Sequence, residues 1–89
     1  MAGPLALPLF QPEASLPVAL ASTPDFTKVY VANQGSNTVT VIDPNRGVVI
    51  TTISVGSEPC DVKITQDGTK AYVSNCGSDT VSVISTKTN

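Results

Sequence analysis

Cys60 and Cys76 are the residues of this chain best suited to covalent chemistry. Two cysteines at this spacing fit neither a C-x-x-C redox pair nor the four-ligand set of a structural zinc site. They either form a disulfide or remain two neighbouring thiols, and both alternatives stay open. A hairpin centred on Asp67-Gly68 would place Cys60 opposite Asn75 and therefore next to Cys76.

The segment Asp43-Pro44-Asn45-Arg46-Gly47 has the spacing with which a calcium-binding loop begins. The twelfth position of such a loop is normally a bidentate Glu, but here it is Ser54, and Pro44 is unusual within the loop. We therefore interpret the segment as a turn between two strands and expect no metal site.

Acid, base and nucleophilic chemistry finds little support in the sequence. The chain has no His, so its many Ser and Thr hydroxyls lack the usual general base. Asp25 and Asp67 stand 42 residues apart in similar contexts, as do Lys28 and Lys70. Repetition at a fixed interval indicates turn carboxylates and solvated charges at strand ends. We predict no catalytic residue, no cofactor site and no enzymatic activity.

Composition limits the remaining classes of function. The chain has 89 residues, of which 40% are hydrophobic and 13% charged, with a formal net charge of −2. Such a chain suits one small folded domain rather than a disordered segment. No basic patch is present to follow a phosphate backbone, so nucleic acid is not an expected partner. No apolar run reaches the roughly 18 residues of a transmembrane helix.

A 42-residue repeat determines the architecture that we expect. Residues 24–47 and 66–89 are identical at 12 of 24 positions. Each copy consists of short segments rich in Thr, Val, Ile and Tyr, which favour β-strands, separated by turn residues. The predicted strands are Val18–Ser22, Lys28–Ala32, Thr38–Asp43, Val48–Val55, Cys60–Thr65, Lys70–Ser74 and Thr80–Ser85. Four short strands in about 42 residues are typical of a β-propeller blade.

The most specific segments are Tyr30-Val31-Ala32-Asn33 and Tyr72-Val73-Ser74-Asn75. One residue after each, the pattern Gly-Ser-x-Thr-Val-x-Val-Ile begins, with Gly35 in the first copy and Gly77 in the second. With them, residues 15–89 resemble the YVTN family of β-propeller repeats. Two departures from that pattern are Phe26, where the family has a turn glycine, and Leu16-Pro17, which replaces Gly-x-x-Pro.

The repeat and the resemblance together imply an all-β chain of antiparallel propeller blades. Residues 15–56 would form a complete four-stranded blade and residues 57–89 a second blade without its outer strand. We expect Tyr30 and Tyr72 to pack between neighbouring blades rather than to stack on a ligand. The Val- and Ile-rich faces left open by only two blades favour association.

Residues 1–14 are rich in proline and lack the basic start of a signal peptide, so we interpret them as an irregular lead-in. An alternative is that they supply the missing outer strand of the second blade.

By resemblance, the function is that of a non-catalytic structural or protein-interaction scaffold. YVTN propellers are often surface-layer, cell-envelope or exported proteins, which favours an extracellular, cell-surface or periplasmic location. The expected partners are proteins, further propeller blades or other copies of the chain. The alternative is a piece of a propeller enzyme or cofactor-binding propeller, of the lactonase, quinoprotein or haem d1 type, whose active site lies in other blades.

Overall fold

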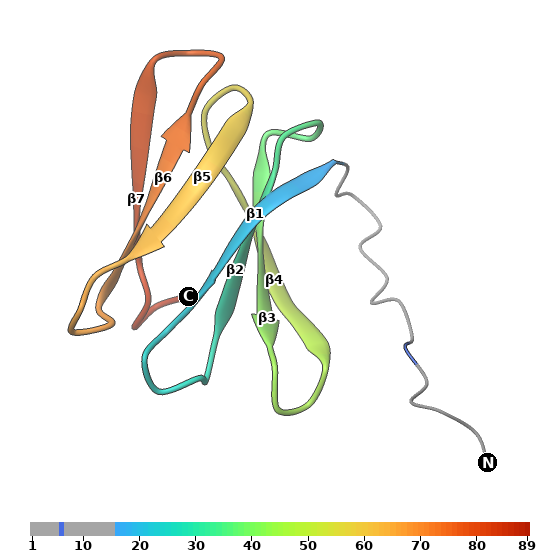
Figure 1. The fold of residues 1–89 in the computed structure, drawn as a ribbon, viewed down its shortest axis with the longest axis vertical. Coiled ribbons are helices and arrows are strands. Elements are labelled where there is room, and N and C mark those ends of the chain that lie inside the picture. The colour runs from blue at the N-terminus through green and yellow to red at the C-terminus, as the bar shows by residue number, and fades with distance from the viewer. Residues whose placement is uncertain (1–5, 7–15) are drawn as a thin grey trace.

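The computed structural model describes residue 6 and residues 16–89, and the strands of this part form two antiparallel sheets (Figure 1). The predicted all-β fold is confirmed, and each predicted strand occurs with ends shifted by at most one residue. The strands are β1 (Pro17–Ser22), β2 (Val29–Asn33), β3 (Thr38–Asp43), β4 (Val48–Ser54), β5 (Pro59–Ile64), β6 (Lys70–Asn75) and β7 (Thr80–Ser85). In the described residues, no helix has the length and apolar character needed to cross a membrane. Apart from residue 6, the lead-in lies outside the described residues, and so does its suggested role as an outer strand.

Each sheet has the meander topology of a propeller blade. Strands β1–β4 follow one another in the first sheet, called here the first blade. Strands β5–β7 do the same in the second sheet, called here the second blade. All neighbouring strands are antiparallel because each is joined to the next by a short turn.

The pairing of β5 with β6 differs from the predicted register at one point. Val62 lies opposite Val73, as a hairpin centred on Asp67-Gly68 requires, but Pro59 rather than Cys60 lies opposite Asn75. Cys60 is the extra residue of an irregularity between Pro59 and Asp61. The prediction that Cys60 faces Asn75 is therefore wrong, because a β-bulge inserts one residue into β5. The first blade has the same irregularity one repeat earlier, between Pro17 and Ala19.

The backbone repeats the 42-residue period even where the residue types differ. Phe26 has a φ of 58° and Gly68, its counterpart, a φ of 75°. Both stand in the left-handed region, which glycine adopts readily and other residues adopt at a cost. The first blade therefore keeps the turn conformation of the second blade although it lacks the glycine, with Phe26 strained in its place.

The hydrophobic core lies between the two blades. Contacts between them are concentrated where β5 lies against β1 and β2, and Figure 1 shows β5 beside β1. The buried cluster combines residues of both sheets: Tyr30, Val39, Val41, Val62, Ala71, Val73 and Ile84. Stacking of one sheet on another explains why the strands carry apolar residues at positions that a one-sided sheet would leave polar.

Candidate functional site

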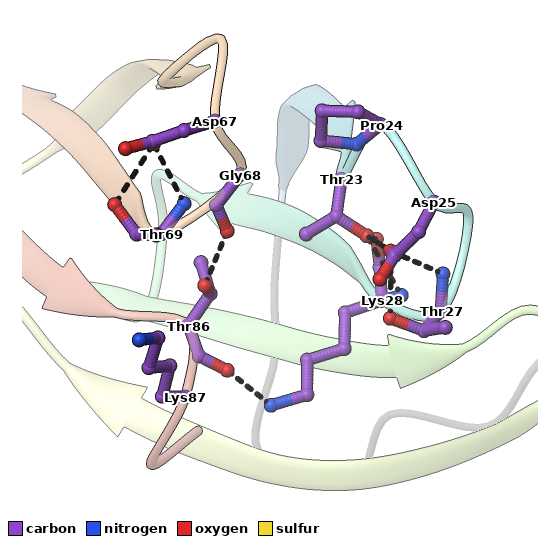
Figure 2. Close-up of a pocket in the computed structure, with 10 residues that line it drawn as sticks. All are labelled: Thr23, Pro24, Asp25, Thr27, Lys28, Asp67, Gly68, Thr69, Thr86 and Lys87. Atoms are coloured by element: carbon purple, nitrogen blue, oxygen red, sulfur yellow. Dashed lines mark hydrogen bonds between the residues drawn. The ribbon is translucent and has the colours of Figure 1, made fainter.

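A cleft of about 310 Å³ opens between the two blades at one end of the stack (Figure 2). The turn between β1 and β2 forms one wall and the turn between β5 and β6 the other, while the segment after β7 closes the base. The lining residues are Thr23, Pro24, Asp25, Thr27, Lys28, Asp67, Gly68, Thr69, Thr86 and Lys87.

The wall from the first blade is organised around the carboxylate of Asp25. Its Oδ1 accepts hydrogen bonds from the hydroxyls of Thr23 and Thr27, both at 2.8 Å, and from the Thr27 amide at 3.1 Å. The Thr23 hydroxyl oxygen in turn accepts the Lys28 amide at 3.2 Å. A short polar side chain that satisfies amides two residues away is a standard means of fixing a tight turn.

The opposite wall repeats this arrangement around Asp67. Its Oδ1 accepts the hydroxyls of Thr65 and Thr69, at 2.7 and 2.8 Å, and the Thr69 amide at 3.1 Å. The two aspartates thus serve the same local purpose in each blade, as their spacing in the sequence predicts.

These hydrogen bonds favour the ionised form of both aspartates. The Thr65 hydroxyl, followed by the amide and hydroxyl of Thr69, lowers the pKa of Asp67 to about 2. The pKa of Asp25 is lowered in the same way, first by the Thr23 hydroxyl and then by Thr27. Each carboxylate is thus held in its ionised form by the hydroxyls and amides of its own turn. Within the described residues, no group of three or more His, Cys, Asp or Glu side chains is placed to hold a metal ion.

Lys28 and Thr86 join the two blades at the base of the cleft. The Lys28 ammonium group donates to the backbone carbonyl of Thr86, and the Thr86 hydroxyl donates to the carbonyl of Gly68 (Figure 2). The prediction that Lys28 is a solvated charge is therefore wrong, because the segment after β7 folds back onto the first blade. Lys70, its counterpart in the second blade, is exposed.

A second candidate site is the outward face of the second blade. The side chains of Tyr72, Val81 and Val83, called here the open face, are 41%, 61% and 56% exposed. Their counterparts one repeat earlier are Tyr30, Val39 and Val41, and each of these is 0% exposed in the core between the blades. Tyr30 packs between blades as predicted, whereas Tyr72 does not, since no described residue covers it to the same extent.

Polar contacts also link the blades around this apolar core. The Tyr30 hydroxyl donates to the backbone oxygen of Asn89 at 2.7 Å, and burial raises the pKa of this tyrosine. On another turn, Oδ1 of Asn37 accepts the Glu58 amide at 2.9 Å. The contact between two blades therefore combines packed Val and Tyr side chains with a few specific hydrogen bonds.

The other residues of the repeat motif lie in the central strands of the blades and in the turns that follow them. Val31 and Val73 are buried in the central strands β2 and β6. Gly35 and Gly77 lie in the exposed turns that follow those strands.

The motif asparagines, Asn33 and Asn75, end β2 and β6 and hydrogen-bond to the next strand. The amide Nδ2 of Asn33 donates to the Thr40 hydroxyl at 2.8 Å, and that of Asn75 to the Ser82 hydroxyl at 2.9 Å. The Oδ1 atoms of both asparagines are buried without a hydrogen-bond partner among the described residues. Both side chains thus tie neighbouring strands within one blade.

Cys60 and Cys76 form a disulfide with a Cα–Cα distance of 5.9 Å. It joins the bulge of β5 to the turn after β6, so it lies within the second blade and does not bridge the two sheets. The equivalent positions of the first blade hold Val18 and Gln34.

The loop that resembles the start of a calcium site is a turn stabilised by its own carboxylate. Oδ1 of Asp43 accepts the amides of Asn45 at 2.9 Å and Arg46 at 3.2 Å. The Gly47 amide donates to the Asp43 carbonyl at 2.9 Å. Asp43 therefore stabilises the turn by accepting hydrogen bonds from the amides that follow it.

Sequence reasoning missed the contacts made by the segment after β7. Thr86 and Asn89 accept hydrogen bonds from the first blade, but they align with Pro44 and Gly47 and share no residue type with them. The one sequence feature that could have pointed to these contacts is the 42-residue spacing. It places Thr86 and Asn89, like Pro44 and Gly47, directly after the third strand of a blade.

Comparison with known proteins supports the fold. No protein-family model and no curated protein matches the chain. Among solved structures, a chain of hydrazine synthase from Kuenenia stuttgartiensis superposes on 97% of this chain, with a TM-score of 0.81 and 27% sequence identity. A functionally unknown protein from Desulfotomaculum acetoxidans DSM 771 superposes on 81%, with a TM-score of 0.65 and 20% identity.

These likenesses are consistent with a β-propeller-like fold, in agreement with the blade topology. The chain spans only 24% and 27% of the length of those two solved chains. No YVTN repeat is identified by the comparisons, so that assignment stays a prediction.

Proposed function

We propose that this chain is a non-catalytic β-propeller-type module that acts as a scaffold by presenting the open face to protein partners. The observation that carries the proposal is the contrast between Tyr72, Val81 and Val83 and their fully buried counterparts in the first blade. A surface built from residues that elsewhere in the same chain form a core is suited to burial by another protein.

The cleft supports the same proposal. Its two aspartates are engaged by hydroxyls and amides of their own turns, and its Lys28 ammonium is bound to a backbone carbonyl. The aspartates stabilise turns and Lys28 links the two blades, so the groups that line the cleft have structural roles.

A location outside the cytoplasm is part of the proposal. The Cys60–Cys76 disulfide supports it, because disulfides persist in oxidising compartments such as the periplasm and the cell surface. The resemblance to exported and surface-layer propellers points the same way.

The test is site-specific photo-cross-linking in the native host. A photoreactive amino acid replaces Val83 on the open face, and the control carries it at Ile50, an exposed residue of the outer strand β4. We expect discrete protein adducts from position 83 and not from position 50. Equal adducts at both positions, or none at position 83, would contradict a protein-binding role for the open face.

A second candidate function is participation in a larger propeller-bearing enzyme. The likeness to a chain of hydrazine synthase, of which this chain spans 24%, favours it. Active-site groups would then come from other blades, and the open face would receive the next one. Mass spectrometry of the endogenous protein would distinguish the two: peptides of this chain in a much longer polypeptide support the enzyme, whereas a free chain of 9.2 kDa supports the scaffold.

A further inference from the structure

We infer that the open face of one chain binds β1 of a second copy, so that copies associate head to tail with the geometry that joins the first blade to the second. The inference rests on the proposed function and names the partner. Its basis is that counterparts of both halves of the contact between the blades recur on the same molecule, where Leu20, Tyr72, Val81 and Val83 are exposed.

One half is the open face, whose counterparts Tyr30, Val39 and Val41 contribute to the core against the second blade. The other half is β1, the counterpart of β5. Leu20 of β1 is 69% exposed, while Val62, its equivalent in β5, is 3% exposed. Pro17 is likewise exposed, whereas Pro59 is buried. A second copy whose β1 takes the position of β5 would cover both sets together.

The polar contacts can be repeated as well. In the assembly, the first blade of the second copy stands where the second blade stands within one chain. Tyr72 then replaces its counterpart Tyr30, and Gly47 of the second copy replaces its counterpart Asn89, so the Tyr72 hydroxyl can donate to the Gly47 carbonyl. The same replacement in the Lys28–Thr86 bond pairs the Lys70 ammonium with the carbonyl of Pro44. Both acceptors are backbone carbonyls, so the change of residue type removes neither one. Lys70 is exposed and available for this contact.

The predicted contact is heterologous, since different surfaces of the two copies meet. Such a contact leaves one open face and one free β1 at the ends of every open assembly, so it continues until the copies close into a ring or extend as a filament. This property separates it from a symmetric dimer of two open faces.

The test measures the mass of the full chain by analytical ultracentrifugation over a range of concentrations. We expect species larger than 9.2 kDa that grow with concentration. Leu20→Asp and Val83→Asp should each weaken association by roughly tenfold or more, because either buries a charge in the contact. Ile50→Asp, on the exposed side of β4, is the matched control and should associate like the unaltered chain.

Mixing the two impaired variants gives the most specific result. Leu20→Asp keeps an intact open face and Val83→Asp keeps an intact β1, so an equimolar mixture should form a pair of twice 9.2 kDa and stop there. Circular dichroism melts verify that each variant folds, and Val81→Asp replaces Val83→Asp if the latter does not.

Three outcomes would overturn the inference: a monomeric unaltered chain at all concentrations, undiminished association of Leu20→Asp, or a mixture that stays monomeric. A monomeric chain that still gives adducts with another protein at position 83 would overturn self-association alone and leave the proposed function standing.

Discussion

Tyr30 and Tyr72 are one 42-residue repeat apart and have the same place in their blades, yet one is fully buried and the other lies on the open face. Tyr30 also donates its hydroxyl to the backbone oxygen of Asn89 at 2.7 Å, and Tyr72 makes no equivalent bond to a described residue. The same residue type in the same strand register is therefore part of the core in one blade and of the surface in the other. The difference comes from whether another blade is stacked against it.

Tyr30→Phe removes this hydrogen bond while keeping the ring. We expect the free energy of unfolding to fall by about 1 kcal/mol, the usual net value of such a bond. Tyr72→Phe is the matched control and should leave stability unchanged. Urea denaturation at a concentration where the chain is monomeric measures both, and equal losses in the two variants would contradict the role assigned to Tyr30.

Phe26→Gly should stabilise the chain by about 1 kcal/mol, because Phe26 is exposed and held at a φ of 58°, which costs a non-glycine residue roughly that much. The reciprocal change, Gly68→Ala, should destabilise it. Gly68 has a φ of 75°, and a Cβ atom there would lie 3.0 Å from Cδ of Pro24. Thermal melts of both variants check the pair, and a destabilised Phe26→Gly would show that the ring makes a contact worth more than the strain.

Loss of the disulfide should lower the stability of the second blade. The bond closes a loop with a sequence separation of 16, for which loop-closure entropy gives about 3 kcal/mol. Replacing Cys60 and Cys76 together by Ser should reduce the free energy of unfolding by about that amount. A reducing agent should destabilise the unaltered chain to a similar extent and have no effect on the double variant, which serves as its control.

Acid should destabilise the chain through the turn aspartates. The pKa of Asp67 is about 2 in the folded chain, against an ordinary value of 3.8, so the unfolded chain binds more protons between about pH 4 and pH 2. The stability that ionised Asp67 contributes is therefore complete above about pH 5 and is lost as the pH falls through this window. Asp25 contributes in the same direction.

The measurement is the melting temperature of the unaltered chain and of Asp67→Asn between pH 6 and pH 2. Asn keeps an oxygen that accepts from Thr65 and Thr69 but does not titrate, so the variant should be less stable at pH 6 and lose less on acidification. Parallel curves for the two proteins would show that the Asp67 turn does not contribute to acid sensitivity.

Much of the fold could be predicted because each strand carries its own local signal. Segments rich in Thr and Val, separated by turn residues, placed the seven strands of the described residues, and recurrence at the 42-residue interval identified Asp25 and Asp67 as turn residues. The bulge at Cys60 could not be predicted in this way, since one inserted residue in a strand leaves no change in composition.

The parts of the site that escaped prediction depend on contacts between blades. Whether Lys28 is solvated or bonded depends on the path of the chain after Ser85, which brings the Thr86 carbonyl within its reach. Whether Tyr72 is covered depends on the presence of another blade. Neither property belongs to the local sequence, because both come from how whole sheets stack.

The periodic hydrogen bonds of the two blades also constrain how such a gene can change in length. An in-frame duplication or deletion of 42 codons would preserve the Thr–Asp–Thr turns, the Asn33-type links between strands and the left-handed positions, since each recurs at that interval. An insertion of an odd number of residues within a strand would turn every side chain beyond it to the opposite face of the sheet. Recombination is thus expected to alter the number of blades in whole steps, with each new blade inheriting a surface that already matches its neighbour.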